Sequence, residues 1–127
     1  MKISNRQFGE IEFTKEHVIK FEQGILGFEH LKDFLFIKTE NDLFYWLNSV
    51  DQPEIVFPLV SIRMIHEEYP LEDKNEPFGV VTLSSDPLKI TVNLKAPVYL
   101  NQDTKTGFQK LIDKDEYPFN FKLFVEN

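Results

Sequence analysis

Residues 78–101 read FGVVTLSSDPLKITVNLKAPVYLN, and apolar and polar side chains alternate along much of this stretch. We predict a strand at Phe78–Leu83, a tight turn at Ser84–Pro87 and a second strand at Leu88–Leu94. In the second strand the apolar side chains fall on one face and the polar ones on the other: Leu88, Ile90, Val92 and Leu94 against Lys89, Thr91, Asn93 and Lys95. Such a period of two is typical of a strand with one face in the core and one in water.

The alternation breaks at Ala96-Pro97 and resumes at Val98–Asn101. Proline has no N–H to donate to a neighbouring strand, so the break predicts a sheet edge or a bulge. An interrupted edge strand with apolar neighbours can accept a strand or helix of a partner protein. This gives the first candidate for partner binding, an edge formed by Asn93, Ala96, Pro97 and Val98. The alternative is a simple bulge that prevents the edge from pairing with other chains.

The rest of the chain contains further short apolar stretches separated by turn residues. Strands are predicted at Ile3–Phe8, Ile11–Phe13, Val18–Phe21, Phe34–Lys38, Leu43–Val50, Ile55–Ile62 and Tyr117–Phe124. Short helical turns are predicted at Phe28–Lys32 and Asp51–Glu54, and Phe108–Ile112 fits either a strand or a helix. Arg63–Pro77 shows no sustained period and is predicted to be a long loop, with or without a brief helical turn.

These elements predict an all-β fold. About eight to ten short, mainly antiparallel strands with about one or two short helical turns indicate a compact barrel-like domain or a sandwich. At this length, residues 1–127 are predicted to form a single β-barrel-like domain. The composition agrees, because 42% hydrophobic residues with thirteen phenylalanines exclude disorder and favour a β-rich interior.

The sequence contains no recognisable catalytic, cofactor-binding or targeting motif. The absence of cysteine excludes disulfides and thiolate metal sites, and His17, His30 and His66 lack the close pair spacing of a zinc site. We therefore predict no metal, no cofactor and no enzymatic activity; a hydrolase would need two converging carboxylates, which the sequence alone cannot pair. No signal peptide is visible and no apolar run approaches the ~20 residues that cross a bilayer, which predicts a cytoplasmic protein without membrane contact.

The formal net charge is −7, and the whole excess lies in the middle of the chain. Residues 40–76 contain nine acidic and two basic side chains, and nine minus two gives seven, whereas 1–39 and 77–127 each hold six of either sign. An acidic surface repels nucleic acid and attracts basic proteins, so no direct nucleic-acid binding is predicted. The second candidate for partner binding is therefore the set Glu67, Glu68, Glu72 and Asp73. The alternative is that these charges only keep a phenylalanine-rich protein soluble.

Tyr45 and Trp46 are neighbours in a predicted strand, so their side chains point to opposite faces. One of them is expected in the core, and the other must be covered by something else. Aromatic side chains of this kind are enriched in the hot spots of protein interfaces. Tyr45 is accordingly the third candidate for a partner contact.

Several of these motifs, taken in order, resemble the flagellar assembly factor FliW family. The resemblance rests on GILGFE at residues 24–29, FYWLNS at 44–49 followed by DQP at 51–53, GVVTL at 79–83 and TVNLKAPVYLN at 91–101. It runs from Ile3 to Asn101, and the segments Arg63–Pro77 and Phe108–Asn127 resemble the family less closely.

The resemblance implies an all-β, non-enzymatic protein that binds flagellin as a chaperone-like partner. It also implies that the protein antagonises the translational repressor CsrA. This antagonism derepresses flagellin synthesis once flagellin has been exported. Because CsrA binds RNA, its surface is expected to be basic, and an acidic partner would attract it and repel RNA. The alternative function is a protein-interaction β-domain of this fold with other partners.

Overall fold

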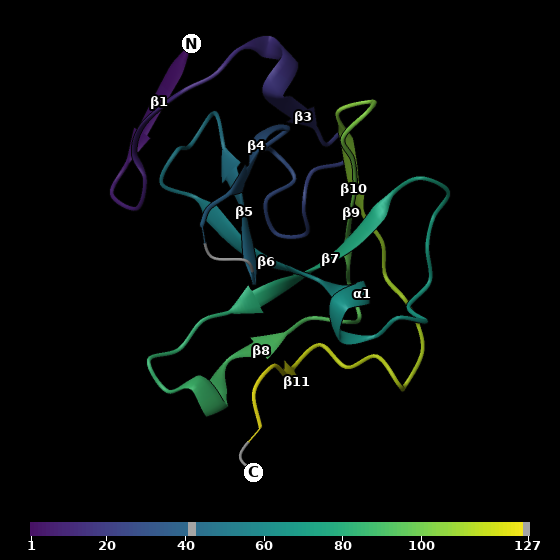
Figure 1. Cartoon of the computed structure of the whole chain (residues 1–127). Coiled ribbons are helices and arrows are strands. Elements are labelled where there is room, and N and C mark those ends of the chain that lie inside the picture. Colours follow the sequence, from purple (N-terminus) through teal and green to yellow (C-terminus); the bar gives the residue numbers. More distant parts are fainter. Residues whose placement is uncertain (41–42, 126–127) are drawn as a thin grey trace.

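The computed structural model describes residues 1–40 and 43–125, and its regular structure is almost entirely β (Figure 1). The strands are β1 (Lys2–Asn5), β2 (Gly9–Glu12), β3 (Val18–Lys20), β4 (Asp33–Lys38), β5 (Phe44–Ser49), β6 (Val56–Ser61), β7 (Glu76–Thr82), β8 (Thr91–Val92), β9 (Val98–Asn101), β10 (Thr106–Gln109) and β11 (Phe121–Lys122). The helical segments are the 3₁₀ turns η1 (Lys15–His17) and η2 (Pro87–Lys89) and the short helix α1 (Ile62–Ile65). Within the described residues, strands and helical turns are both slightly more numerous than the sequence predicted.

Seven of these strands close into a barrel. Their order is β7-β6-β5-β4-β3-β10-β9, and β9 pairs back to β7. Neighbours in the ring are antiparallel except β3 and β10, which run parallel and share the pair Lys20–Thr106. Across this seam the backbone N–H of Lys20 donates to the carbonyl of Lys105 at 2.9 Å. The prediction of an all-β, barrel-like fold is confirmed, and closure removes the free edges of the ring.

Apolar side chains fill the inside of the barrel. This first cluster takes buried residues from strands all around the ring and from the loop after β3: Ile19, Phe21, Ile25, Leu31, Phe34, Leu47, Leu59, Phe78, Val98 and Leu100. At the parallel seam, Phe21 lies directly against Gly107 of β10. A Cβ atom at Gly107 would lie 2.4 Å from Cζ of Phe21, so the missing side chain makes room for the ring where the barrel closes.

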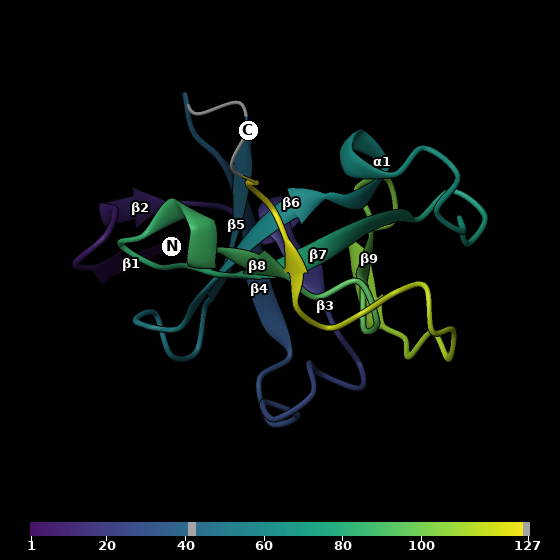
Figure 2. The ribbon, with the colours of Figure 1, turned by 90° about the horizontal axis from the view of Figure 1, so that it is seen from below.

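A second buried cluster lies outside the ring, on the other face of β6 and β7. Here β7 extends past the barrel to pair with β8, which pairs in turn with β11 (Figure 2). The cluster contains Val60, Ile62, Tyr69, Val81, Ile90, Val92, Leu94, Ile112 and Tyr117. It therefore joins the α1–β7 connection to the C-terminal segment, although the two are far apart in sequence.

The hairpin β1–β2 forms a separate two-stranded sheet that packs on the outer face of the barrel. The side-chain amide of Asn5 donates to Oδ1 of Asn48 at 2.7 Å and to the carbonyl of Pro53 at 2.9 Å, which fixes the hairpin to β5 and to the turn after it. The predicted strand Ile3–Phe8 ends at Asn5 because residues 6–8 turn the chain into β2. Figures 1 and 2 show this hairpin and α1 on opposite sides of the barrel.

The predicted strand Leu88–Leu94 is reduced to the two residues of β8. The Asp86 carboxylate accepts a hydrogen bond from the N–H of Leu88 at 3.0 Å, and Pro87 begins η2, so the chain turns before it extends. Ile90, Val92 and Leu94 still face the core, whereas Leu88 is exposed. The alternation was therefore interpreted correctly from Ile90 onward and wrongly at Leu88.

Three other local predictions need correction. Residues 28–32 and 51–54 form isolated turns rather than helices, closed by the hydrogen bonds from Leu31 N–H to Phe28 (3.0 Å) and from Ile55 N–H to Gln52 (2.9 Å). The final strand predicted at 117–124 is limited to β11, because Pro118 lacks the N–H that a continuous ladder needs. For 108–112, where strand and helix were both open, the structure gives the end of β10 at residues 108–109 and no regular element at 110–112.

Candidate protein-interaction site

The connection between α1 and β7 holds the acidic residues predicted to contact a partner. The brief helix closes with the N–H of His66 donating to the carbonyl of Ile62 at 2.8 Å. Nε of Arg63 then donates to the carbonyl of Glu67 at 2.9 Å, which keeps the chain close to the helix as it leaves. The side chains of Glu67 and Glu68 remain exposed directly after this bend. The predicted long loop is thus present, and it begins with the brief helical turn that the prediction allowed.

Tyr69 fixes this loop to the second cluster. Its side chain is buried, its hydroxyl donates to the carbonyl of Leu94, and its ring centre lies 4.7 Å from that of Tyr117. Burial of a tyrosine is favourable when the ring packs and the hydroxyl finds an acceptor, and both conditions are met here. Glu67 and Glu68 are therefore presented from a well-supported backbone.

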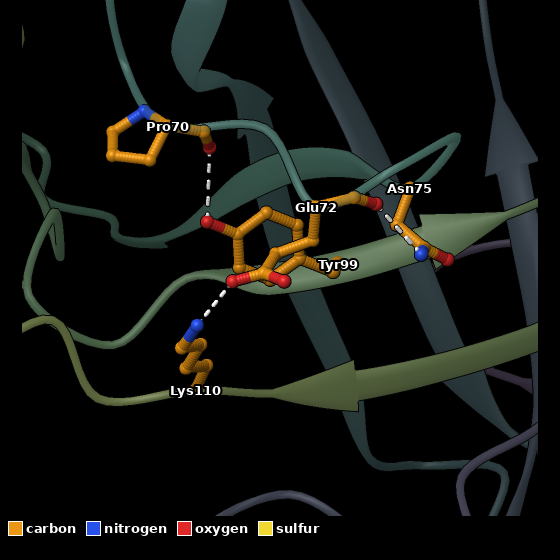
Figure 3. A network of polar contacts seen from close by, with 5 residues as sticks. All are labelled: Pro70, Glu72, Asn75, Tyr99 and Lys110. Atoms are coloured by element: carbon orange, nitrogen blue, oxygen red, sulfur yellow. Dashed lines mark hydrogen bonds and ion pairs between the residues drawn. The ribbon is translucent and has the colours of Figure 1, made fainter.

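A network of polar contacts fixes the second half of the loop (Figure 3). The Tyr99 hydroxyl donates to the carbonyl of Pro70 at 3.0 Å, and the Asn75 side-chain amide donates to the carbonyl of Glu72 at 2.8 Å. Figure 3 also shows the ammonium group of Lys110 and the carboxylate of Glu72 pointing toward each other, in an ion pair that ties the loop to the end of β10. Asp73, at the exposed tip, has a φ of 52°, which aspartate tolerates better than most residues.

The C-terminal segment brings another carboxylate to this region. Burial raises the pKa of the Tyr117 hydroxyl, and the carboxylates of Glu116 and Glu68 raise this pKa further because they disfavour a second negative charge. Both carboxylates therefore lie near the same hydroxyl group. We call the surface formed by Glu67, Glu68, Glu72, Asp73 and Glu116 the acidic surface.

Glu116 was missed by the sequence analysis because residues 77–127 carry balanced charge as a whole. The signal that could have indicated it is the local run Asp113-Lys114-Asp115-Glu116, in which three of four side chains are acidic. Asp42, one of the nine acids of the middle segment, lies outside the described residues.

Tyr45 and Trp46 point to opposite faces of β5, and both are half-buried. The Tyr45 ring stacks on Phe36 and meets the edge of Phe78, with both centroid distances at 5.3 Å. Trp46 is covered on the outer face by Phe8 of the N-terminal hairpin, 5.8 Å away. Tyr45 thus belongs to the barrel wall rather than to the acidic surface, and its contact with a partner stays a prediction.

The predicted edge at Ala96-Pro97 is not an edge. Val98 pairs with Gln109 of β10 on one side and with Phe78 of β7 on the other, and its side chain is 0% exposed. The break in the alternation is a turn, in which Oδ1 of Asn93 accepts the N–H groups of Lys95 and Ala96, both at 3.0 Å.

The interpretation of this segment as a sheet edge is therefore wrong. Pro97, which lacks an N–H, lies in the turn before β9 and not in the paired strand itself. Asn93, Ala96, Pro97 and Val98 have no free strand edge to offer. Any contact that they make with a partner stays a prediction.

The three histidines lie in separate parts of the structure: His17 in η1, His30 in the turn before β4 and His66 after α1. Among residues 1–40 and 43–125, no group of three or more His, Cys, Asp or Glu side chains is placed to hold a metal ion. In the same part of the chain, no helix has the length and apolar character needed to cross a membrane.

The buried tyrosines predict a loss of stability at high pH. Burial raises the pKa of Tyr69, Tyr99 and Tyr117 above the usual value of about 10. As the pH rises, these hydroxyls ionise at a lower pH in the unfolded chain than in the folded one. Their contribution to the free energy of unfolding is therefore complete below about pH 10 and is lost as the pH rises further. Each tyrosine with a raised pKa steepens the fall of the free energy of unfolding by up to about 1.4 kcal/mol per pH unit.

Urea unfolding between about pH 8 and pH 11 measures this effect, with the Tyr69→Phe and Tyr117→Phe variants as references. The three proteins share every other titratable group, so the difference isolates the tyrosines. We expect a shallower decline in each variant than in the parent chain. Parallel curves would show that the hydroxyls do not contribute.

Comparisons with known proteins agree with this architecture. The chain matches the family model described as FliW protein over residues 2–123, which includes 63–77 and most of the C-terminal segment that the motifs had left out. It is 35% identical to the flagellar assembly factor FliW of Caldicellulosiruptor saccharolyticus, over 96% of this chain and 90% of that relative. The corresponding values for the flagellar assembly factor FliW of Bdellovibrio bacteriovorus are 31%, 99% and 81%.

The structural comparison points the same way. A crystal structure of the flagellar assembly factor FliW superposes with a TM-score of 0.89 at 26% identity, and the match covers 99% of each chain. Flagellar assembly factors are not an enzyme class. The chain therefore belongs to the FliW family of flagellar assembly factors.

Proposed function

We propose that this chain binds flagellin as a chaperone-like partner in the cytoplasm and antagonises a CsrA-type translational repressor. The antagonism derepresses flagellin synthesis. Membership of the FliW family supports a role in flagellar assembly. The observation that carries the finer proposal is the acidic surface, which combines the α1–β7 loop with Glu116 of the C-terminal segment. We further propose that residues 1–127 act as a single domain.

Charge is the physical basis of the proposed antagonism. An RNA-binding repressor needs basic side chains to contact phosphates, and such a surface is complementary to clustered carboxylates. A net charge of −7 also increases the rate of encounter with a basic partner. Once bound, the carboxylates occupy or face the cations that RNA requires and repel its phosphates.

The rigidity of the loop supports the same proposal. Tyr69, Tyr99 and Asn75 fix the backbone that presents the carboxylates, so binding orders few additional residues. Because ordering costs free energy on association, a preformed acidic surface binds more tightly than a flexible loop of equal charge. Lys110 neutralises part of this charge at Glu72, which leaves Glu67, Glu68, Asp73 and Glu116 as the more available carboxylates.

Titration calorimetry of the purified chain against flagellin and against the CsrA-type repressor tests the proposal. We expect both to bind, and we expect the repressor to lose its RNA in a gel-shift assay when the chain is added. Repressor affinity should fall about tenfold or more between about 50 and 500 mM salt, because exposed charges are screened. A repressor that neither binds nor releases RNA would contradict the antagonism, and failure of both partners to bind would favour a β-domain with other partners.

A further inference from the structure

An apolar groove lies between the loop after β3 and the end of β10. It has a volume of about 300 Å³, and its lining includes Gly24, Leu26, Ala96, Gln109, Lys110 and Leu111. The side chains of Leu26 and Leu111 are 76% and 68% exposed. Single exposed leucines are ordinary on protein surfaces, but two that line one groove with alanine and glycine form a patch suited to binding.

The groove is held in shape by one side chain and one glycine. Oε1 of Gln109 accepts the N–H of Leu26 at 2.8 Å, while Nε2 of the same residue donates to the carbonyl of Ala96 at 2.9 Å. Gly24 has a φ of 70°, and a Cβ atom there would lie 2.6 Å from Cα of Glu29. The backbone beneath Leu26 is therefore fixed in a tight turn, and the apolar lining is preformed.

The groove also adjoins the acidic surface. Lys110 forms the ion pair with Glu72 that Figure 3 shows. Because Lys110 also lines the groove, the carboxylate of Glu72 lies within one side chain's reach of the apolar lining. Asp73 follows Glu72 directly and is exposed. A segment that crosses both features would meet apolar surface first and negative charge next.

We propose that this groove holds an aliphatic side chain of the basic partner, while neighbouring lysine or arginine side chains of that partner reach the acidic surface. The inference rests on the proposed function and adds to it the apolar part of the interface. Charge complementarity at Asp73 and at the other unpaired carboxylates of the acidic surface selects a basic segment over an acidic one. The buried aliphatic contact supplies affinity that salt does not screen, as in interfaces with an apolar centre and a charged rim.

The double variant Leu26→Ser/Leu111→Ser tests this assignment by titration calorimetry with the CsrA-type repressor. The matched control is Leu83→Ser/Leu88→Ser, which removes two other exposed leucines, one directly after β7 and one in η2. We expect the groove variant to bind about tenfold or more weakly at both low and high salt, with a less negative heat-capacity change on binding. The control variant should bind like the parent chain.

The outcomes separate the groove from the proposed function. Unchanged affinity of the groove variant, together with weakened binding when the acidic surface is neutralised, would overturn the groove assignment and leave the proposed function in place. An equal loss in the control pair would also overturn it, because the effect would then come from surface hydrophobicity in general. A parent chain that does not bind the repressor would overturn the proposed function and this inference together.

Discussion

Replacement of Glu67, Glu68 and Glu72 by glutamine and of Asp73 by asparagine should weaken repressor binding about thirtyfold and flagellin binding much less. Removal of four carboxylates changes the formal net charge from −7 to −3. If each carboxylate contributes about 0.5 kcal/mol, as exposed ion pairs do, the four together contribute about 2 kcal/mol. That free energy corresponds to about a factor of thirty in Kd. Calorimetry and the release of RNA from the repressor measure the change.

A second set of four exposed carboxylates provides the control for net charge. Glu10 and Glu12 lie in β2 of the N-terminal hairpin, Glu16 lies in η1 directly after it, and Glu54 follows Pro53, whose carbonyl accepts a hydrogen bond from Asn5 of the hairpin. Figure 1 shows the hairpin on the side of the barrel away from α1. Replacement of these glutamates by glutamine gives the same formal charge of −3 and should leave repressor binding within about twofold of the parent. Equal losses for the two sets would show that only the overall charge matters, and equal losses of repressor and flagellin binding would show that the acidic surface does not discriminate between them.

Tyr69→Ala should be the most destabilising single substitution in the loop, lowering the free energy of unfolding by about 3–5 kcal/mol. The side chain is almost fully buried in the second cluster, packs against Tyr117 and His66, and donates a hydrogen bond to Leu94. Its loss leaves a cavity and a buried carbonyl without its partner. Against a typical total of about 5–15 kcal/mol, this is a large fraction of the stability. Urea unfolding followed by fluorescence or circular dichroism measures it.

Tyr69→Phe separates packing from hydrogen bonding at the same position. This variant keeps the ring and loses the donor to Leu94, so we expect a cost of only about 1–2 kcal/mol. Because it leaves the cluster filled, it should also keep repressor affinity close to that of the parent chain. Similar destabilisation by the two variants would mean that the hydroxyl, rather than the ring, holds the loop.

Local chemistry accounts for the parts of the fold that the sequence predicted well. Ile90, Val92 and Leu94 face the core as their alternation indicated, because side-chain direction along a strand follows directly from spacing. Leu88 does not, since Asp86 and Pro87 start a 3₁₀ turn whose capping hydrogen bond competes with an extended backbone. The alternation of apolar and polar residues is the same on both sides of Ile90. The hydrogen bond from the N–H of Leu88 to Asp86 decides where the strand begins.

The candidate site was predicted only in part. The acidic loop and its exposure followed from the charge count and from the irregular sequence of residues 63–77. Its support by Tyr69 and Tyr99 could not be predicted, because their acceptors, the carbonyls of Leu94 and Pro70, are distant in sequence. The groove at Leu26 and Leu111 also escaped prediction, since it forms only where the loop after β3 meets the end of β10.

The amino-acid sequence alone was sufficient for the β class, the excess of acidic charge and the family. These depend on the order and chemistry of neighbouring residues, which can be read along the chain. The closure of the barrel could be recognised only from the tertiary structure. Because the barrel is closed, Val98, predicted to lie at a sheet edge, is paired on both sides. The placement of Glu116 and Glu68 near the Tyr117 hydroxyl, and of Leu26 and Leu111 along one groove, also required the tertiary structure. Such contacts join residues far apart in the chain, and they are selected by the packing of the whole barrel rather than by any local pattern.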